Sequence, residues 1–363
     1  MARELDTYRG KRDAGRTPEP VPDARPLPAG NGDTFVIQEH HARALHWDFR
    51  LERDGVLVSW AVPKGLPLDP KTNHLAVQTE DHPLEYAAFA GDIPAGEYGG
   101  GHVIAWDHGT YEREKWTERE VKVVLHGSRI SGRYVLFRTR GKRDWMIHRM
   151  DPPPRPGWRP VPALVQPMQA QPAGALPAAA EDALWGYEMA WDGERAVVYV
   201  DGGRIRTLDG ADREVTAAYP ELRPLGAAMG SVSAVFDGEI VAFDATGQPS
   251  TDRLEQRRTA GTPAAIGRLV TAAPVTYLIF DLLHLDGEPL IDVAYAGRRR
   301  RLDELGLAGP SWQTPPYFPG GGVAGLRASQ EQGLAGVVAK RQASTYRAGR
   351  QSGDWLIVAG HGR

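Results

Sequence analysis

Residues 45–52 read LHWDFRLE and alternate strictly between apolar and polar side chains. The apolar set is Leu45, Trp47, Phe49 and Leu51, and the polar set is His46, Asp48, Arg50 and Glu52. Because successive side chains of a strand point to opposite faces, this period of two predicts a half-buried β-strand. Asp54-Gly55 follows as a hairpin turn, and VLVSWAV (residues 56–62) is the predicted return strand. The segment therefore predicts an antiparallel sheet.

The rest of the first half also predicts short strands rather than helices. They are VIAW (residues 103–106), VKVVLHG (121–127) and RYVLFRT (133–139). Several short strands joined by turns favour a closed or strongly curved antiparallel sheet. We therefore expect an all-β small barrel over residues 34–150, preceded by an extended, Pro- and Gly-rich arm over residues 1–33 that folds over it.

A Pro-rich segment divides the chain. Residues 151–177 hold nine prolines in 27 positions, which predicts a semi-rigid linker over residues 151–180. Strands and helices mix beyond it, so we expect a second domain of the α+β class over residues 181–363. The predicted strands are RAVVYV (195–200), AVFDGEIVAF (234–243) and VTYLIFDLLHL (275–285), and the predicted helices are AGRRRRLDELG (296–306) and VAGLRASQEQG (323–333).

The composition excludes several classes of protein. Hydrophobic residues at 41% and charged residues at 25% are typical of globular proteins. No apolar run approaches 18 residues, so we expect no membrane span, and the N-terminus lacks the apolar core of a secretory signal. There is no cysteine, so any metal must be held by His, Asp, Glu or backbone oxygen. The lack of cysteine fits a cytoplasmic protein. The net charge of −3 does not by itself indicate a nucleic-acid partner.

The polar face of residues 45–52 is a candidate site. His46, Asp48 and Arg50 lie on one side of the predicted strand, about 7 Å apart at successive positions, and His40 lies just upstream. Imidazole and carboxylate suit divalent metals such as Mn, Zn or Fe, and an arginine beside them suits a phosphate. The alternative is a strand whose polar side simply faces water. TEDHPLEY (residues 79–86) adds further polar groups, but the residues alone favour the two interpretations about equally.

Longer stretches carry a resemblance to a known family. They are FVIQEHHARALHWDFRLERDGVLVSWAVPKG (35–65), EDHPLEY (80–86) and GDIPAGEYGGGHVIAWDHGTYE (91–112). Together they resemble the phosphoesterase domain of bacterial ligase D, an enzyme of non-homologous end joining. The resemblance implies a small β-barrel that heals DNA 3′ ends with manganese, or another divalent metal such as Zn or Co. It removes 3′ phosphates and 3′ ribonucleosides.

The same resemblance implies roles for particular residues. His40, His46 and Asp48 would be the metal ligands, and Arg50 and His82 would hold or protonate the phosphate, with His82 as the general acid. The other implied site residues are Tyr86, Glu19 of the arm and Lys64 of PKG. His74 stands where the family usually has an arginine.

The second half resembles the nucleotidyltransferase domain of ATP-dependent DNA ligases, an ATP-grasp-like fold. The motifs are YEMAWDGERA (187–196), VFDGEIVAFD (235–244), YLIFDLLHLDG (277–287), LAGVVAKR (334–341) and SGDWLIVAG (352–360). The family's first motif is Glu-x-Lys-x-Asp-Gly-x-Arg, and its lysine forms a covalent adenylate. Here the motif reads Glu188, Ala190, Asp192, Gly193 and Arg195 at those positions. Alanine has no nucleophile, so the resemblance implies a degenerate site.

Other ligase motif positions are kept or lost. Asp237, Glu239, Phe280 and Lys340 remain, whereas Leu208, Ala335, Ile357 and Ala359 replace functional residues of the family. Lys340 is also the only lysine after residue 150. Ligase activity and ATP binding are therefore doubtful, and we expect no OB-fold after the fifth motif.

The function predicted from the sequence is a metal-dependent DNA 3′-phosphoesterase with a pseudo-ligase domain that docks DNA or partners. Two alternatives are an active ATP-dependent DNA ligase and a non-catalytic scaffold that binds DNA ends. The implied partners are DNA 3′ ends, in a primer-template or a broken duplex, and Ku-like end-joining proteins, which would place the protein with the nucleoid. The run Arg298–Arg301 would either touch DNA phosphates or form a solvated helix face.

Overall fold

The predicted hairpin forms and lies within the first sheet. Strands β2 (Leu45–Arg53) and β3 (Val56–Val62) pair antiparallel, with Phe49 opposite Trp60. Asp54 and Gly55 have φ values of 52° and 83°, the left-handed conformation that a two-residue hairpin turn of type I′ requires. The turn thus fixes the register that keeps the apolar residues of both strands on one face.

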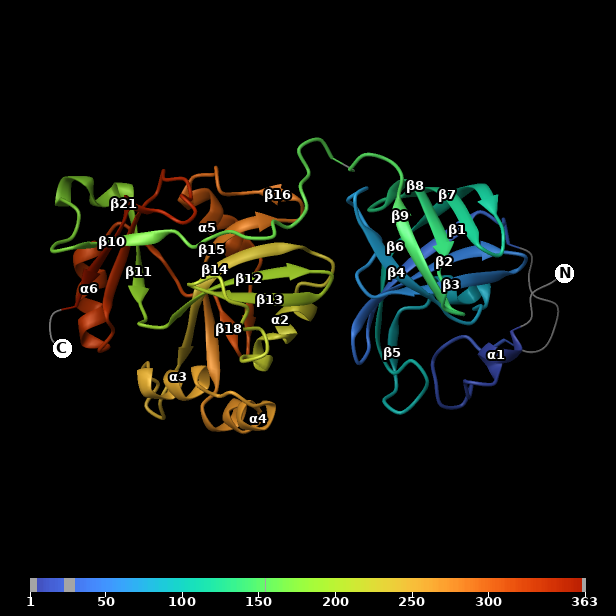
Figure 1. Cartoon of the computed structure of the whole chain (residues 1–363), viewed down its shortest axis with the longest axis horizontal. Helices are drawn as coiled ribbons and strands as arrows, with labels where there is room; N and C mark the ends of the chain where they lie inside the picture. The colour runs from blue at the N-terminus through green and yellow to red at the C-terminus, as the bar shows by residue number, and fades with distance from the viewer. Residues whose placement is uncertain (1–4, 23–29, 154, 361–363) are drawn as a thin grey trace. The chain divides into compact units, whose positions relative to one another are not determined.

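The structure, a computed structural model, describes residues 5–22, 30–153 and 155–360. The chain divides into two units, Met1–Trp158 and Arg159–Arg363 (Figure 1). No helix among these described residues is long and apolar enough to cross a membrane.

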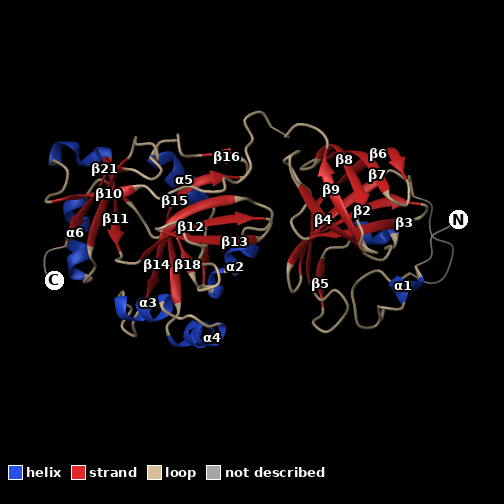
Figure 2. Cartoon of the chain, in the orientation of Figure 1, coloured by secondary structure: helices blue, strands red, loops and turns tan. Residues whose placement is uncertain are grey.

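The first unit is almost entirely strand, as Figure 2 shows. Its elements besides β2 and β3 are α1 (Asp6–Arg9), β1 (Thr34–His41), β4 (Asn73–Gln78), η1 (Leu84–Ala88), β5 (Gly91–Ile93), β6 (Gly101–Trp116), β7 (Glu120–Gly127), β8 (Ser131–Arg138) and β9 (Asp144–Arg149). Within the described residues, eight strands run in the order β1-β2-β3-β4-β9-β8-β7-β6, and β6 pairs again with β1. The sheet is therefore closed, which confirms the predicted small barrel.

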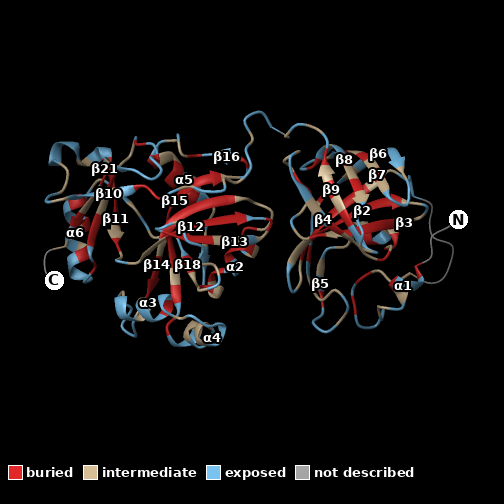
Figure 3. Cartoon of the chain, viewed as in Figure 1, coloured by how far each residue is buried: buried red, intermediate tan, exposed pale blue. Residues whose placement is uncertain are grey.

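The barrel encloses a continuous apolar core. Phe35, Trp47, Phe49, Leu51 and Trp60 are among its fully buried members. Strands β1, β2 and β3 are buried over most of their length, as Figure 3 shows. Burial of such large side chains contributes about 1.5–3 kcal/mol each to the free energy of unfolding. Polar residues at the intervening positions are left on the outer face of the same strands.

The N-terminal arm packs against the barrel as expected. Leu5 and Tyr8 join the barrel core, and the Tyr8 hydroxyl donates a hydrogen bond to the Pro20 carbonyl at 2.8 Å. The arm is not extended throughout, because α1 forms one short helical turn at its start. These contacts hold the described part of the arm, residues 5–22, over one side of the first unit.

The second unit mixes helices and strands, which confirms the α+β class (Figure 2). Its strands are β10 (Gln169–Ala173), β11 (Trp185–Ala190), β12 (Glu194–Asp201), β13 (Arg204–Asp209), β14 (Ala234–Ala242), β15 (Val275–Leu285), β16 (Glu288–Pro289), β17 (Ala308–Gly309), β18 (Trp312–Gln313), β19 (Phe318–Pro319), β20 (Gly336–Arg341) and β21 (Gln351–Ala359). Its helices are η2 (Ala179–Leu184), η3 (Pro220–Leu222), α2 (Pro224–Ala228), α3 (Thr251–Arg258), α4 (Pro263–Ala272), α5 (Tyr295–Glu304) and α6 (Gly322–Glu331).

Two sheets organise the second unit. One has the order β10-β21-β20-β11-β19, and the other has the order β13-β12-β14-β15-β18-β17, with β16 beside β15. Helices α5 and α6 form where the sequence predicts them, and α5 packs on β15. The ligase-like motifs of the sequence lie on β11, β14, β15, β20 and β21.

The predicted linker over residues 151–180 is structured in its second half. Strand β10 pairs parallel with β21, and Met168 just before it is fully buried. The chain thus belongs to the second unit from Arg159 onward. Pro172 is accommodated because β10 is an edge strand, where a missing N–H breaks no ladder hydrogen bond on the open side.

Candidate active site

One outer face of β1, β2 and β3 carries a row of polar side chains. Its members are Gln38, His40, His46, Asp48, Arg50 and Ser59. The strand register places His40 opposite His46, Gln38 opposite Asp48, and Arg50 opposite Ser59. Side chains at such cross-strand positions lie within reach of one another. The alternation read from the sequence therefore brings the predicted site residues of β1 and β2 onto one surface.

The three predicted metal ligands lie together. His40, His46 and Asp48 each offer one ligand atom, and these atoms lie within 4.8 Å of one another. Nδ1 of His40 is 3.6 Å from Oδ2 of Asp48, and Nε2 of His46 is 3.8 Å from Oδ1. Nε2 of His40 is buried and has no hydrogen-bond partner within the described part of the chain. Two imidazoles and a carboxylate form a donor set that suits a divalent transition metal, so the residues fit a metal ion.

Arg50 is fully buried beneath this group and is held by three side chains. Its Nη2 donates to Asp48 at 3.0 Å, its Nη1 to Ser59 at 2.8 Å, and its Nε to Gln38 at 2.8 Å. Burial alone would raise the pKa of Asp48, but the charge of Arg50 and the neighbouring His40 outweigh burial and hold that pKa well below its ordinary value. Asp48 is therefore a carboxylate, the state that a metal ligand needs.

His82 and Tyr86 stand beside Arg50. Nδ1 of His82 lies 2.9 Å from the Glu80 carbonyl oxygen, which can only accept, so Nδ1 carries the proton. Burial, together with the charges of Arg50 and Arg12, holds the pKa of His82 well below its ordinary value. The ring is therefore neutral in the free protein and its Nε2 is a proton acceptor. The predicted role of His82 as general acid stays a prediction.

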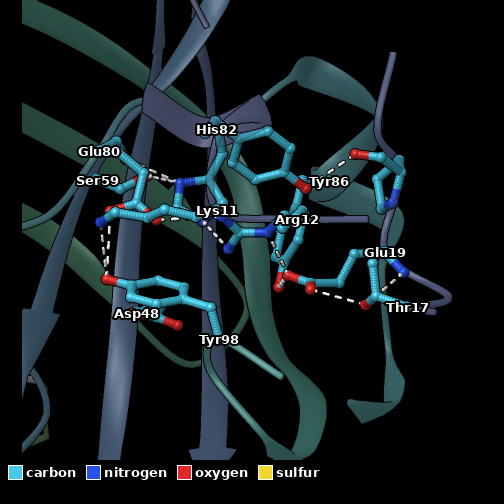
Figure 4. A network of polar contacts seen from close by, with 12 residues as sticks. Lys11, Arg12, Thr17, Glu19, Asp48, Ser59, Glu80, His82, Tyr86 and Tyr98 are labelled. Atoms are coloured by element: carbon cyan, nitrogen blue, oxygen red, sulfur yellow. Dashed lines mark hydrogen bonds and ion pairs between the residues drawn. The ribbon is translucent and has the colours of Figure 1, made fainter. Parts of the chain in front are cut away.

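The arm contributes to the same site, as Figure 4 shows. Glu19 accepts hydrogen bonds from Tyr86 at 3.0 Å, from Arg12 at 2.8 Å and from Thr17 at 2.8 Å. Arg12 also lies 3.4 Å from Nε2 of His82 and donates to Glu80 at 3.2 Å. Glu19 of the arm thus lies in the lining of the same cavity, and its role in the site stays a prediction.

A cavity of about 1280 Å³ opens over these groups. It is lined by the three predicted metal ligands, by Arg12, Glu19, Arg50, His82 and Tyr86, and by the glycine-rich loop around Gly96–Gly101. Two residues that the resemblance singled out lie outside this lining. Lys64 is exposed in the turn after β3, and Nδ1 of His74 lies 2.7 Å from the Gly65 carbonyl oxygen. The structure thus does not bring Lys64 or His74 to the cavity.

Several side chains of this site were not predicted. The sequence could have predicted Gln38 and Ser59 as members of the site. Gln38 lies two positions from His40 on the same face of β1, and Ser59 pairs with Arg50 across β2 and β3. Arg12 and Glu80 gave no local signal, since they meet only when the arm packs on the barrel.

In the second unit, Glu188 and Lys340 form a buried ion pair. Nζ of Lys340 lies 2.6 Å from Glu188 on the adjacent strand, and Tyr295 donates to the same carboxylate at 2.5 Å. The ammonium also lies 4.2 Å from the ring centroids of Phe280 and of Trp355. Burial lowers the pKa of Lys340, although the Glu188 carboxylate opposes this shift. The remaining lysine of the ligase-like motifs is thus engaged with the motif's own glutamate.

The other ligase-like residues cluster near this pair. Arg195 donates to both carboxylate oxygens of Asp237, at 2.7 and 2.6 Å, and lies 4.7 Å from the Phe280 ring centroid. The Gly193 amide donates to Glu239 at 3.4 Å, and burial raises the pKa of Glu239. Asp192 has a left-handed φ of 57° in the turn between β11 and β12.

The position of the family's nucleophile lies at the end of β11. Ala190 is 6% exposed there and pairs with Gly336 of β20. Its methyl group cannot attack a phosphate.

The arginine run of α5 does not form one DNA-facing surface. Arg298 and Arg299 are buried, at 0% and 1% exposure. Arg298 forms a two-point ion pair with Asp281 of β15, at 2.7 and 2.8 Å. The prediction that the run contacts phosphates or faces solvent is therefore wrong for Arg298 and Arg299. Helix α5 packs on β15, so one side of the helix is buried.

Comparison with known families agrees with this division. The family model described as the DNA Ligase D 3′-phosphoesterase domain matches residues 38–138, and the one described as the ATP dependent DNA ligase domain matches residues 162–358. The second match gives no support to the predicted doubt about ATP binding.

Individual relatives span nearly the whole chain. The multifunctional non-homologous end joining protein LigD of Mycobacterium bovis is 46% identical over 98% of this chain, and that of Pseudomonas aeruginosa is 34% identical over 98%. The chain covers 45% and 47% of these proteins, so it spans about half their length. The solved structure of mycobacterial DNA ligase D complexed with ATP and MES is 33% identical over 54% of this chain and 60% of that one, with a TM-score of 0.47. The chain belongs to the ligase D family, with a 3′-phosphoesterase domain followed by an ATP-dependent DNA ligase domain.

Proposed function

We propose that the barrel is a metal-dependent phosphoesterase that removes 3′ phosphates and 3′ ribonucleosides from DNA ends during the repair of double-strand breaks. The observation that carries this proposal is the convergence of His40, His46 and Asp48 with Arg50 in one cavity. A metal site next to a buried guanidinium fits a phosphate ester better than a neutral substrate. Manganese is the metal that we propose for this site.

His40, His46 and Asp48 would hold the metal, which supplies Lewis-acid stabilisation of charge at phosphorus when it is bound. Arg50 spends three of its five N–H groups on protein partners, so two remain for phosphate oxygens. Arg12 adds a second positive charge at the cavity wall. Together these groups bind the phosphate and stabilise negative charge that develops on it.

His82 handles a proton in this proposal. The ring is neutral in the free protein, and a bound phosphate anion favours its charged form and raises its pKa. Once the Arg12 guanidinium turns from Nε2 of His82 toward the phosphate, His82 is protonated at Nε2 and then gives the proton to the leaving oxygen. Its Nδ1–H stays on the Glu80 carbonyl and keeps the ring oriented.

The test is release of phosphate from a 3′-phosphorylated primer-template. Wild-type protein should release it with Mn²⁺, and His46→Ala should lose at least about a hundredfold in kcat/KM, because loss even of a residue that only supports a metal ligand costs about 10- to 100-fold. His126→Ala, an exposed histidine on β7, is the matched control and should behave as wild type. No release by wild type with Mn²⁺, Mg²⁺, Zn²⁺ or Co²⁺ would favour the non-catalytic scaffold instead.

For the second unit, we propose a ligase-like domain that does not form the lysine adenylate and that docks DNA or end-joining partners such as Ku-like proteins. Ala190 supports the first part, because the position of the nucleophile holds a methyl group. The Lys340–Glu188 pair supports it further, since the single lysine of this unit is buried and engaged.

Incubation with labelled ATP, followed by denaturing electrophoresis, tests the adenylate. The wild-type chain should carry no label, and Ala190→Lys shows whether the surrounding pocket still supports the reaction. A labelled wild-type band would establish the active ligase and end this part of the proposal.

A further inference from the structure

The barrel has a second cavity, at the end of the strands away from the metal ligands. It has a volume of about 420 Å³ and is lined by Arg53, Val58, Trp60, Gln78, Trp116, Thr117, Glu118, Val121, Arg138 and Trp145. These residues lie at the β2–β3, β6–β7 and β8–β9 hairpins and at the end of β4. We call this cavity the barrel mouth. Mouths of β-barrels are recurrent ligand sites, and this volume lies within the usual range for them.

Three indole rings form the inside of the barrel mouth. Trp60 and Trp145 are buried, with ring centroids 5.9 Å apart, and they close the cavity toward the core. Trp116 is only partly buried and lies 6.4 Å from Trp60. An accessible aromatic wall over a buried aromatic floor suits a flat ring that stacks, such as a nucleobase.

The rim of the barrel mouth is positively charged. The guanidinium of Arg53 lies 4.3 Å from the Trp116 ring centroid; its Nε donates to Asp54 at 3.2 Å, and its buried Nη1 has no hydrogen-bond partner in the described part of the chain. Arg138 also lines the cavity and is exposed at the end of β8, next to the exposed Arg140, Lys142 and Arg143 of the β8–β9 turn and the exposed Asp144 that follows them. Glu118 is the single acidic residue of the lining. Aromatic rings with a cationic rim are the usual composition of a site for single-stranded nucleic acid.

Strand geometry gives the separation between the barrel mouth and the metal site. Asp48 and Arg53 are five positions apart on β2, which corresponds to about 17 Å along the strand. Asp48 faces the outer surface, whereas the barrel mouth opens from the core side of the sheet. At the stacked spacing of about 3.4 Å per nucleotide, a DNA strand would cover this separation with about five nucleotides, and an extended strand with fewer.

We propose that the barrel mouth is a second DNA contact, which stacks an unpaired base of a single strand on Trp116 while Arg53 and Arg138 hold its phosphates. This inference rests on the proposed function, since it assumes DNA as the substrate. It assigns the barrel two separate contacts with one DNA end, the terminal phosphate at the metal site and an unpaired base at the barrel mouth.

Binding of a fluorescent, single-stranded thymidine oligonucleotide of about twelve nucleotides, without a 3′ phosphate, tests this assignment on the full chain. Trp116→Ala should raise Kd about tenfold, as loss of one stacked base does. The matched control is Trp106→Ala, a partly buried tryptophan on the same strand that does not line the barrel mouth. It should leave Kd unchanged.

The salt dependence of binding provides a second readout that a folding defect does not mimic. Arg138→Ala replaces an exposed side chain and should lower the slope of log K against log salt by about 0.7, the value for one phosphate contact on a single strand. Arg113→Ala, exposed on β6 and outside the lining, should leave the slope unchanged.

Three outcomes decide the matter. Kd and slope equal to wild type in both barrel-mouth variants would overturn the inference, even if the wild type releases 3′ phosphate. Displacement of the oligonucleotide by free dTMP as effectively as by unlabelled oligonucleotide would assign a mononucleotide site and overturn the DNA contact. A protein that shows the expected binding changes but releases no phosphate would sustain this contact and refute the phosphoesterase alone.

Discussion

At the scale of single residues, Arg50 connects the chemistry of the first site with its stability. Its guanidinium is buried, and its three hydrogen bonds orient Asp48, Gln38 and Ser59 around the cavity. A planar fork is needed for this arrangement, because a lysine ammonium cannot donate in three fixed coplanar directions. A positive charge at this position without the guanidinium geometry would therefore not replace Arg50.

Arg50→Lys tests this geometric requirement. We expect kcat/KM for 3′-phosphate release to fall about a hundredfold or more, and the free energy of unfolding to fall by about 1–3 kcal/mol, because at least one buried partner loses its donor. Kinetic assays and urea unfolding measure the two effects. Arg113→Lys on exposed β6 is the control, and full activity of Arg50→Lys would show that charge is sufficient.

At the scale of secondary-structure elements, the arm is joined to the barrel by charged contacts. Glu80, just after β4, accepts hydrogen bonds from Lys11 at 2.9 Å and from Arg12 at 3.2 Å. Burial alone would raise the pKa of Glu80, but these donors outweigh it and hold the pKa below its ordinary value. The Glu80 carboxylate therefore stabilises the docked arm, and this stabilisation is complete at pH values above the ordinary carboxyl pKa. It is lost as the pH falls through the lowered pKa of Glu80 in the docked state.

Limited trypsin digestion at Lys11 and Arg12 during a pH-jump series reports arm docking. Wild-type arm opening should increase below about pH 4.5, whereas Glu80→Gln should already be about tenfold more open at pH 7 and should lack this acid dependence. Glu85→Gln, an exposed neighbour on η1, should match wild type at every pH. Equal opening of Glu80→Gln and wild type at pH 7 would show that the apolar contacts of Leu5 and Tyr8 suffice.

Helix α5 shows how neighbouring arginines of one element differ. Arg298 is buried against Asp281, whereas the Arg300 side chain is 73% exposed. Removal of one partner leaves the other charge buried, so Arg298→Ala should destabilise the second unit by about 3–5 kcal/mol. Arg300→Ala should change the free energy of unfolding by less than about 0.5 kcal/mol. Denaturant unfolding followed by circular dichroism compares the two, and equal effects would contradict the structural role of Arg298.

At the scale of the whole molecule, the two units have separate apolar cores, and only the first contains the predicted metal ligands. A ligand stabilises the unit that binds it, by about 2.7 kcal/mol at a concentration one hundred times Kd. Scanning calorimetry with Mn²⁺ should therefore raise the transition of the first unit by about 5–10 °C and leave that of the second unit in place. His46→Ala should abolish the shift, and a shift that persists in this variant would place the ion elsewhere.

Local sequence pattern predicted the barrel strands and placed the three proposed metal ligands on one face, whereas their role as ligands came from the family resemblance and stays a prediction. The period of two in residues 45–52 fixes which side chains share a face, and cross-strand pairing then brings His40 to His46 and Asp48. The sequence also shows that alanine, at position 190, replaces the lysine nucleophile of the ligase family. These features follow from neighbours along the chain or from adjacent strands, so the sequence alone predicts them.

Only the tertiary structure decided the contacts between distant segments. Lys11 and Glu80 are 69 positions apart, and Tyr295 and Glu188 are 107 positions apart, so no local period relates them. The burial of Arg298 depends likewise on the sheet that α5 covers, and the barrel mouth exists because three hairpins end at the same rim. Strand closure and the packing of arm and helices determine such contacts, because they set which side chains lose water and which charges become neighbours.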